Sequence, residues 1–222
     1  MIQLFETMKS ALERGENVVL CSILASSGSA PRGAGAKMAV FQNGQTLGTI
    51  GGGAVERIAA QQTGASYCQA FCLAPNQVND IGMICGGNVT VYFRFFDHEN
   101  ARDLELIKTI LELLASGQDA WLVSRMEDGK ITAMGTFDEA HGLRFAELDE
   151  TILRPWLTSS AVYRKGEPSY YVEPISRAGR VYIFGGGHVG KALVPVLANV
   201  GFRAAVFDNR EDFAKPENYP MA

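Results

Sequence analysis

The stretch Arg180-Val181-Tyr182-Ile183-Phe184-Gly185-Gly186-Gly187-His188-Val189-Gly190 decides the fold of the C-terminal part of the chain. Its first five residues are typical of a hydrophobic strand, and the next six match the spacing G-x-G-x-x-G. Residues 191–200 predict the helix that follows, and residues 202–207 predict a second strand. Asp208 ends that strand, 18 residues after Gly190. Glycines alone are weak support, but this whole order predicts the first half of a Rossmann unit.

Each part of the loop has its own physical role. Gly185 permits a tight turn, Gly187 lets backbone approach a phosphate, and Gly190 lets the helix pack on the strand. The helix N-terminus supplies free N–H groups and a positive dipole end. His188 is open to two interpretations: a cap or packing residue, or a direct hydrogen bond to a bound phosphate. With Asp208, these residues predict a site for NAD(P) or another nucleotide; the alternative is a Rossmann-like scaffold without a ligand.

A Rossmann half needs at least a third strand to bury both faces of its sheet. We therefore expect residues 180–222 to be a truncated domain, or one that is completed by another chain. An unpaired sheet edge also invites pairing with a second chain, so a homodimer is expected.

The residues before this point predict a separate mixed α/β domain, residues 1–175. Helices are expected at residues 2–14, 54–63 and 102–115. Strands are expected at residues 18–24, 37–41, 46–50, 67–73, 89–96, 120–126, 131–137 and 170–175. Residues 139–167 are mixed and polar-interrupted, so we interpret the region of about 139–175 as a lid or linker. The boundary is expected near residues 176–179.

Composition narrows the class of protein. The 222 residues are 47% hydrophobic and 20% charged, which is typical of a soluble globular protein. A net charge of −4 argues against nucleic-acid binding. No apolar run reaches the roughly 20 residues that span a membrane, and the N-terminus lacks a signal peptide pattern. We expect a cytoplasmic chain with reduced cysteines.

Two glycine-rich loops of the first domain are suited to anions. Residues 26–37 contain three serine hydroxyls, among them that of Ser29, together with the forked guanidinium of Arg32 and the ammonium of Lys37. Such a set of groups fits an oxyanion. Residues 48–53 open a helix and predict a second cradle of backbone N–H groups. Its candidate residues are Gly51, Gly52, Gly53 and Glu56. Glu56 could instead serve only as a partner of the helix dipole.

A third loop contains Cys85, Gly86 and Gly87. A cysteine on such a turn can expose its sulfur next to backbone N–H groups, which lower the pKa of a thiol. Cys21, Cys68 and Cys72 lie within strand-like runs and need only core packing. Cys85 is therefore the candidate reactive cysteine, although it too could serve only as packing.

Four segments together resemble the xanthine dehydrogenase accessory proteins, the XdhC/CoxI family. They are GSAPRGAGAKM (28–38), GTIGGGAVE (48–56), DIGMICGGNVTVYF (80–93) and VYIFGGGHVGKAL (181–193). The resemblance covers most of the chain from about residue 18 and is weakest between about 97 and 175.

The resemblance implies an N-terminal domain joined to a Rossmann domain. It also implies a role in binding and protecting molybdenum cofactor and delivering it to molybdenum hydroxylases. The implied partner is the cofactor-free form of a xanthine dehydrogenase-like hydroxylase, with a cysteine desulfurase as a further candidate. A soft thiolate suits molybdenum, so Cys85 is the candidate metal contact.

Two other functions stay open on the sequence. An NAD(P)-dependent oxidoreductase is favoured by Asp208, but no second-domain acid–base pair is recognisable. The other open function is that of a non-catalytic regulator, which senses a nucleotide and binds a partner. The chaperone interpretation predicts no enzymatic turnover of its own.

Overall fold

The computed structural model describes residues 1–61, 64–73, 87–175, 180–200 and 202–221. Its contacts divide the chain into two compact units, Met1–Ile175 and Ser176–Ala222. Each unit is described by itself below.

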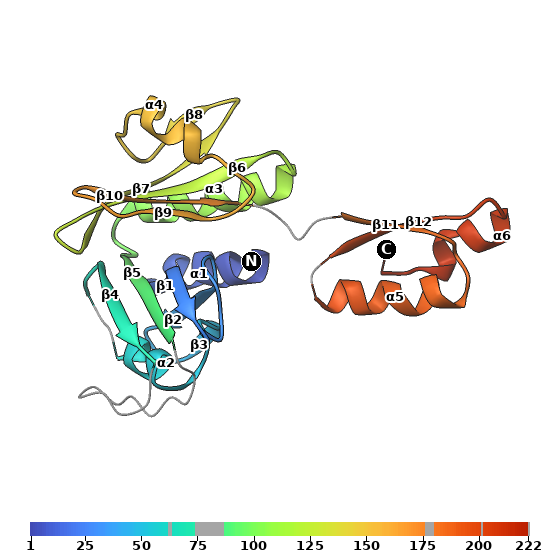
Figure 1. Ribbon diagram of the computed structural model, residues 1–222, viewed down its shortest axis with the longest axis horizontal. Helices are drawn as coiled ribbons and strands as arrows, with labels where there is room; N and C mark the ends of the chain where they lie inside the picture. Colours follow the sequence, from blue (N-terminus) through green and yellow to red (C-terminus); the bar gives the residue numbers. More distant parts are fainter. Residues whose placement is uncertain (62–63, 74–86, 176–179, 201, 222) are drawn as a thin grey trace. The chain divides into compact units, whose positions relative to one another are not determined.

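The first unit is built from one large sheet and several helices (Figure 1). Its helices are α1 (Ile2–Glu13), α2 (Gly53–Ala60), α3 (Ala101–Ser116), α4 (Glu150–Leu153) and the short η1 (Arg154–Trp156). Its strands are β1 (Val18–Gly28), β2 (Lys37–Phe41), β3 (Thr46–Gly48), β4 (Tyr67–Cys72), β5 (Gly87–Phe96), β6 (Ala120–Glu127), β7 (Lys130–Asp138), β8 (Gly142–Arg144), β9 (Val162–Arg164) and β10 (Ser169–Pro174).

The strands follow the order β3-β2-β1-β5-β4-β7-β6-β10-β9, with β8 paired to β7. All pairs in this sheet are antiparallel, and the long strand β1 pairs with both β2 and β5. The β4–β7 junction rests on the single pair Tyr67 and Lys130. The predicted hairpin is present as β6 and β7, with Asp128 and Gly129 both at positive φ, as a tight two-residue turn requires.

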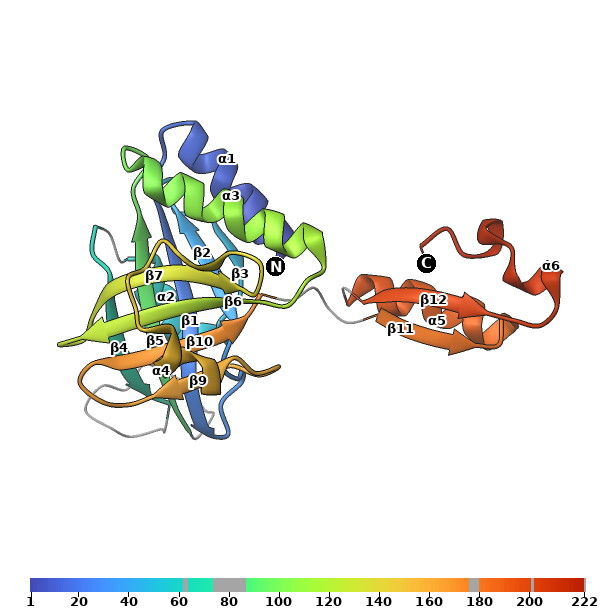
Figure 2. The same ribbon diagram turned by 90° about the horizontal axis from the view of Figure 1, so that it is seen from above.

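Helices α1 and α3 lie side by side along this unit (Figure 2). The buried side of α1 carries Leu4, Phe5, Met8 and Leu12, which recur at helical spacing and therefore share one face. The Asn100 side chain caps the start of α3, and Gly117 ends it in the left-handed conformation. Both helices bury their apolar faces in the main core of the unit.

Strand β10 also contacts β1 and β2, although several strands separate them in the sheet order. The Tyr171 hydroxyl on β10 lies 3.3 Å from the Ile23 carbonyl on β1. The main core likewise combines Leu20 and Leu24 of β1 with Tyr171 of β10. The sheet therefore curls until its two halves share one core.

This packing corrects the interpretation of residues 139–175 as a lid or linker. The region contains β8, α4, η1, β9 and β10, and β10 is a fully paired strand of the sheet. Leu153 and Val172 are completely buried in a cluster with Val123 and Phe137. The strand expected at residues 170–175 is present as β10, whereas β8 and β9 are too short for their period to be read from sequence.

The second unit contains β11 (Arg180–Phe184), α5 (His188–Asn199), β12 (Arg203–Phe207), α6 (Glu211–Ala214) and η2 (Pro216–Asn218). Strands β11 and β12 pair in parallel through the α5 crossover, in register from Arg180 with Arg203 to Phe184 with Phe207. This is the predicted strand–loop–helix–strand order, and α5 begins three residues earlier than expected. The predicted fold class is confirmed: a mixed α/β unit followed by a Rossmann-like unit.

Among the described residues, no helix is both long and apolar enough to cross a membrane.

Candidate functional site

The glycine-rich loops of the first unit meet at one end of strand β1 (Figure 1). Gly28 at the end of β1 pairs with Gly87 at the start of β5. A Cβ on Gly87 would lie 2.6 Å from the Ser27 carbonyl oxygen and 3.2 Å from the Ser29 nitrogen. Gly87 is thus required by a close approach between backbones, since a side chain would collide with the loop that follows β1.

The second glycine cluster joins the same place through Pro31. A Cβ on Gly51 would lie 3.3 Å from the Pro31 side chain, and Gly51 has φ near 120°. The loops after β1 and before α2 are therefore in contact, and Gly87 belongs to the same cluster. Sequence reasoning identified each motif but gave no reason to expect the three to converge.

The loop before α2 holds an anion of its own. The Oε1 atom of Glu56 accepts hydrogen bonds from the Thr49 hydroxyl at 2.6 Å, from Gly52 N–H at 2.8 Å and from Ile50 N–H at 3.0 Å. Burial raises the pKa of this carboxyl, but these hydrogen bonds outweigh it and the net pKa lies below its ordinary value. The backbone donors predicted to hold a ligand are thus largely used by Glu56.

Lys37 is also engaged inside the protein. Its ammonium lies 2.5 Å from the Glu173 carboxylate of β10, and both side chains are 5% exposed. The Tyr171 hydroxyl lies 3.0 Å from the same carboxylate oxygen. This arrangement corrects the expectation that Lys37 contributes a free positive charge to the anion loop.

Ser29 and Arg32, by contrast, are exposed in the loop after β1. Gly33 beside them has open space where a Cβ would stand. The accessible polar groups of this loop therefore include the hydroxyls of Ser26, Ser27 and Ser29 and the guanidinium of Arg32.

Three of the four cysteines, Cys21, Cys68 and Cys72, lie within the described residues. Burial raises the pKa of the Cys21 thiol to about 12, with a further contribution from Glu56, and raises that of Cys68 to about 11. Cys21 lies in β1, and Cys68 and Cys72 lie in β4, as the packing interpretation predicts. Cys85 and Gly86 lie outside the described residues. Within the described part of the chain, no group of three or more His, Cys, Asp or Glu is placed to hold a metal ion.

In the second unit the glycines have the expected geometry. A Cβ on Gly190 would lie 2.5 Å from the Gly185 carbonyl oxygen, so glycine is required where α5 packs on the loop. Gly185 and Gly187 face open space within 4 Å. His188 is exposed at the first position of α5, and Gly187 precedes it without a side-chain cap. The first N–H groups of α5 thus stand beside accessible backbone, as an anion site requires.

Asp208 is tied to the loop and to a neighbouring arginine. Its carboxylate accepts Gly186 N–H at 2.8 Å and two hydrogen bonds from the Arg210 guanidinium, each at 2.9 Å. The Arg210 hydrogen bonds, first among several causes, hold the pKa of Asp208 well below its ordinary value. The side chain is only 3% exposed, so a ribose hydroxyl reaches it only if Arg210 moves.

The residues after β12 cover Gly186. The Tyr219 hydroxyl lies 2.5 Å from the Gly186 carbonyl and 2.7 Å from that of Phe213. Sequence reasoning missed Arg210 and Tyr219 as residues that shape this loop. Their effect depends on how the chain folds back after β12, which no local pattern reveals.

The fold and the sites together define a class of two-unit proteins. The first unit is an α/β unit with glycine-rich loops, and the second is a Rossmann-like unit with a glycine-rich loop at the start of a helix. Comparison with known proteins finds two matching family models. Residues 11–67 match the XdhC and CoxI family, and residues 181–222 match the XdhC Rossmann domain. Over these two ranges the chain is similar to that family.

Two relatives extend the comparison over the whole chain. A Bacillus subtilis protein, described as a probable subunit of xanthine dehydrogenase, is 26% identical over 230 residues, covering 98% of this chain and 68% of its own length. A crystal structure of a xanthine dehydrogenase from Bacillus halodurans matches with a TM-score of 0.74 and 20% identity. The match covers all of the present chain and 66% of the length of the Bacillus halodurans chain. This second likeness concerns the fold.

Proposed function

We propose that this protein binds molybdenum cofactor and delivers it to a xanthine dehydrogenase-like molybdenum hydroxylase, acting as a chaperone rather than as an enzyme. The observation that carries the proposal is the convergence of the loop after β1, the loop before α2 and Gly87 on one end of the first unit. The match of residues 11–67 to the XdhC and CoxI family and the name of the similar Bacillus subtilis protein support a link to xanthine dehydrogenase.

The groups at this end fit part of the cargo. The cofactor is a pyranopterin with a dithiolene, a molybdenum–oxo centre and a phosphate or dinucleotide tail, so its carrier needs oxyanion donors. Ser29 and Arg32 are exposed and of the right chemistry for the tail. Glu56 and Lys37 support the loops from within, because each is already bound to another part of the protein.

The proposed partner is the cofactor-free hydroxylase. A cysteine desulfurase is a second proposed partner, because a carrier must receive mature cofactor before it transfers the cofactor to the hydroxylase. The proposed compartment is the cytoplasm. The two units act as separate domains in this account, residues 1–175 for the cofactor and residues 180–222 for a nucleotide.

Retention of cofactor tests the proposal. The 222-residue chain is mixed anaerobically with molybdenum cofactor released from a molybdenum enzyme, then separated by gel filtration, and protein-bound molybdenum is measured by mass spectrometry. We expect molybdenum to co-elute with the wild type and with Arg14→Gln, a surface arginine at the end of α1. Arg32→Gln should retain less. Elution of all molybdenum with the small molecules contradicts the proposal.

We also propose a nucleotide site on the second unit, favoured by the open space at Gly185 and Gly187 beside the start of α5. Asp208 is masked by Arg210, so Arg210→Ala should strengthen binding of NAD or ADP by freeing a ribose acceptor. Isothermal titration checks this. Equal affinity in Arg210→Ala and wild type would exclude Asp208 as a ribose ligand.

A homodimer is the proposed assembly. Phe184 and Tyr182 of β11 are 82% and 55% exposed, and apolar surface of this kind marks an interaction site. Sedimentation at high micromolar concentration should show a dimer, whereas a monomer there refutes the assembly.

A further inference from the structure

A cavity of about 550 Å³ lies in the first unit, away from the glycine loops. It is bounded by the start of α3, by β7 and by residues 145–147. Arg94 contributes to its wall from β5, seven residues after Gly87. At about 3.3 Å per strand residue, that places it roughly 23 Å along the strand from the glycine loops.

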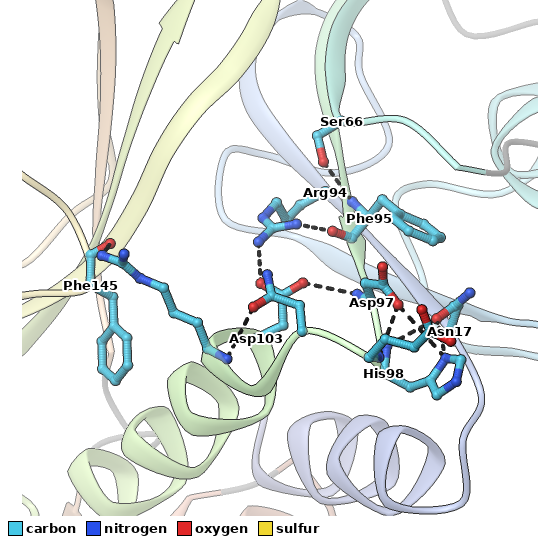
Figure 3. A network of polar contacts seen from close by, with 11 residues as sticks. Asn17, Ser66, Arg94, Phe95, Asp97, His98, Asp103 and Phe145 are labelled. Atoms are coloured by element: carbon cyan, nitrogen blue, oxygen red, sulfur yellow. Dashed lines mark hydrogen bonds and ion pairs between the residues drawn. The ribbon is translucent and has the colours of Figure 1, made fainter.

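One wall of the cavity is a closed ion pair. Arg94 donates to Asp103 at 2.5 Å and to the Phe95 carbonyl, and Asp103 also accepts the Asp97 N–H at 2.9 Å (Figure 3). Ser66 on the same wall accepts the Phe95 N–H. The charges of Arg94 and Asp103 therefore compensate each other and brace the start of α3 against β5.

Two further arginines, Arg102 and Arg125, also line the cavity. Arg102 donates to the Phe145 carbonyl at 2.7 Å, and no carboxylate of the described residues lies within 4.0 Å of its guanidinium. Arg125 is paired with Glu127, yet its Nε is buried and has no acceptor among the described residues. The lining thus carries three arginines and the two carboxylates of Asp103 and Glu147, and it includes a buried N–H group without an acceptor among the described residues, which is costly to leave unpaired.

The wall that carries Phe145 is held in a strained backbone. Phe145 has φ of 66°, a conformation that residues other than glycine rarely adopt. Gly135 of β7 lies where a Cβ would collide with the Arg144 carbonyl and with Ala146. Strain of this kind persists where the surrounding structure fixes it, and it is common at binding sites.

We propose that this cavity binds a small organic oxyanion, whose carboxylate or phosphate group is held by Arg102 and Arg125. The body of the ligand lies against Leu106, Ile131 and Met134, which give the cavity an apolar side. The volume is within the roughly 300–1,000 Å³ of small-molecule sites. Glu147 also lines the cavity and, like Arg102, is exposed, so solvent screens both charges to a similar degree. This site is independent of the proposed cofactor role.

Isothermal titration of the 222-residue chain tests the proposal with four probes: phenyl phosphate, benzoate, inorganic phosphate and the uncharged benzamide. We expect phenyl phosphate or benzoate to bind and benzamide not to bind. Binding of only one of the two aromatic anions identifies the head group as phosphate or carboxylate. Arg102→Gln should weaken binding at least tenfold, which corresponds to about 1.4 kcal/mol.

Arg14→Gln is the matched control, because Arg14 is 58% exposed and paired only on the surface with Glu16. It should bind like wild type. Amide resonances of Ser66, Thr132 and Phe145 should shift on titration, which locates the probe in the cavity. Absence of binding by both aromatic anions overturns the proposal, as does equal weakening in Arg14→Gln and Arg102→Gln. Inorganic phosphate binding as tightly as phenyl phosphate overturns the role of the apolar side.

Discussion

The ammonium of Lys37 on β2 lies 2.5 Å from the carboxylate of Glu173 on β10, and both side chains are 5% exposed. The pair joins residues that are 136 positions apart in the chain. It also anchors the end of the loop that follows β1, since Lys37 Nζ lies 3.3 Å from the Gly35 carbonyl. The loop that carries Ser29 and Arg32 therefore depends on contacts across the curled sheet.

Lys37→Met should destabilise the protein by about 3–5 kcal/mol, because it leaves the Glu173 carboxylate buried without a counter-charge. Urea denaturation measures this. Lys37→Met with Glu173→Leu should recover most of the loss. Lys9→Met removes only a surface pair with Glu13 and should change stability by less than about 0.5 kcal/mol. A loss in Lys37→Met no larger than in Lys9→Met contradicts the buried-pair account.

Gly87→Ala should separate the glycine loops. The added methyl would meet the Ser27 carbonyl at 2.6 Å, so the loop after β1 must shift away from β5. We expect lower thermal stability and less retained molybdenum than in wild type. Gly33→Ala is the matched control, since Gly33 has open space and no positive φ. If Gly87→Ala retains as much molybdenum as Gly33→Ala, the convergence of the loops does not matter for binding.

The folded protein should lose stability in acid partly through Glu56. Its pKa is lower in the folded chain than the ordinary value of 4.5, so the unfolded chain binds the proton first as pH falls. The stabilisation is complete above about pH 4.5 and is lost as pH falls through the lower, folded value. Denaturation across this range should show the advantage of wild type over Glu56→Gln shrinking in acid. An advantage that stays constant with pH would exclude the charged carboxylate as its source.

Cys85→Ser should fold normally yet bind or transfer cofactor poorly, if its sulfur contacts molybdenum. Serine is close to cysteine in size but lacks the soft ligand, and a loss of about 1.4 kcal/mol weakens binding tenfold. Cys21→Ser is the control and should leave binding intact, because Cys21 is buried within β1. Wild-type affinity in Cys85→Ser leaves the glycine loops as the site and removes the ligand role.

The sequence predicted those features that depend on neighbouring residues. The order strand, glycine loop, helix, strand and Asp208 is local, and it appears in the second unit as expected. Asp128-Gly129 likewise marked the β6–β7 turn, because both residues tolerate positive φ. The convergence of two glycine loops with Gly87 and the pairing of Lys37 with Glu173 are long-range contacts, which composition and period do not encode. The strand expected at residues 170–175 is present as β10, but its place in the core, within a region interpreted as a lid or linker, depends on long-range contacts of the same kind.

Glu56 shows a different limit. Its position in the first turn of α2 favoured two roles, a ligand contact or a partner of the helix end. The structure adds a third, in which the carboxylate organises residues 49–52 ahead of the helix. The sequence motif alone does not distinguish a loop that binds an external anion from a loop whose N–H groups bind a carboxylate of the same chain.

Transfer of cofactor to a cofactor-free hydroxylase tests the central claim most directly. The 222-residue chain is loaded with molybdenum cofactor, freed of excess by gel filtration, and mixed with cofactor-free xanthine dehydrogenase, whose oxidation of xanthine is then followed. We predict that activity appears with loaded wild type, falls with loaded Gly87→Ala at equal protein, and does not appear with unloaded chain. Activation no greater than that from an equal amount of free cofactor would contradict a role in delivery.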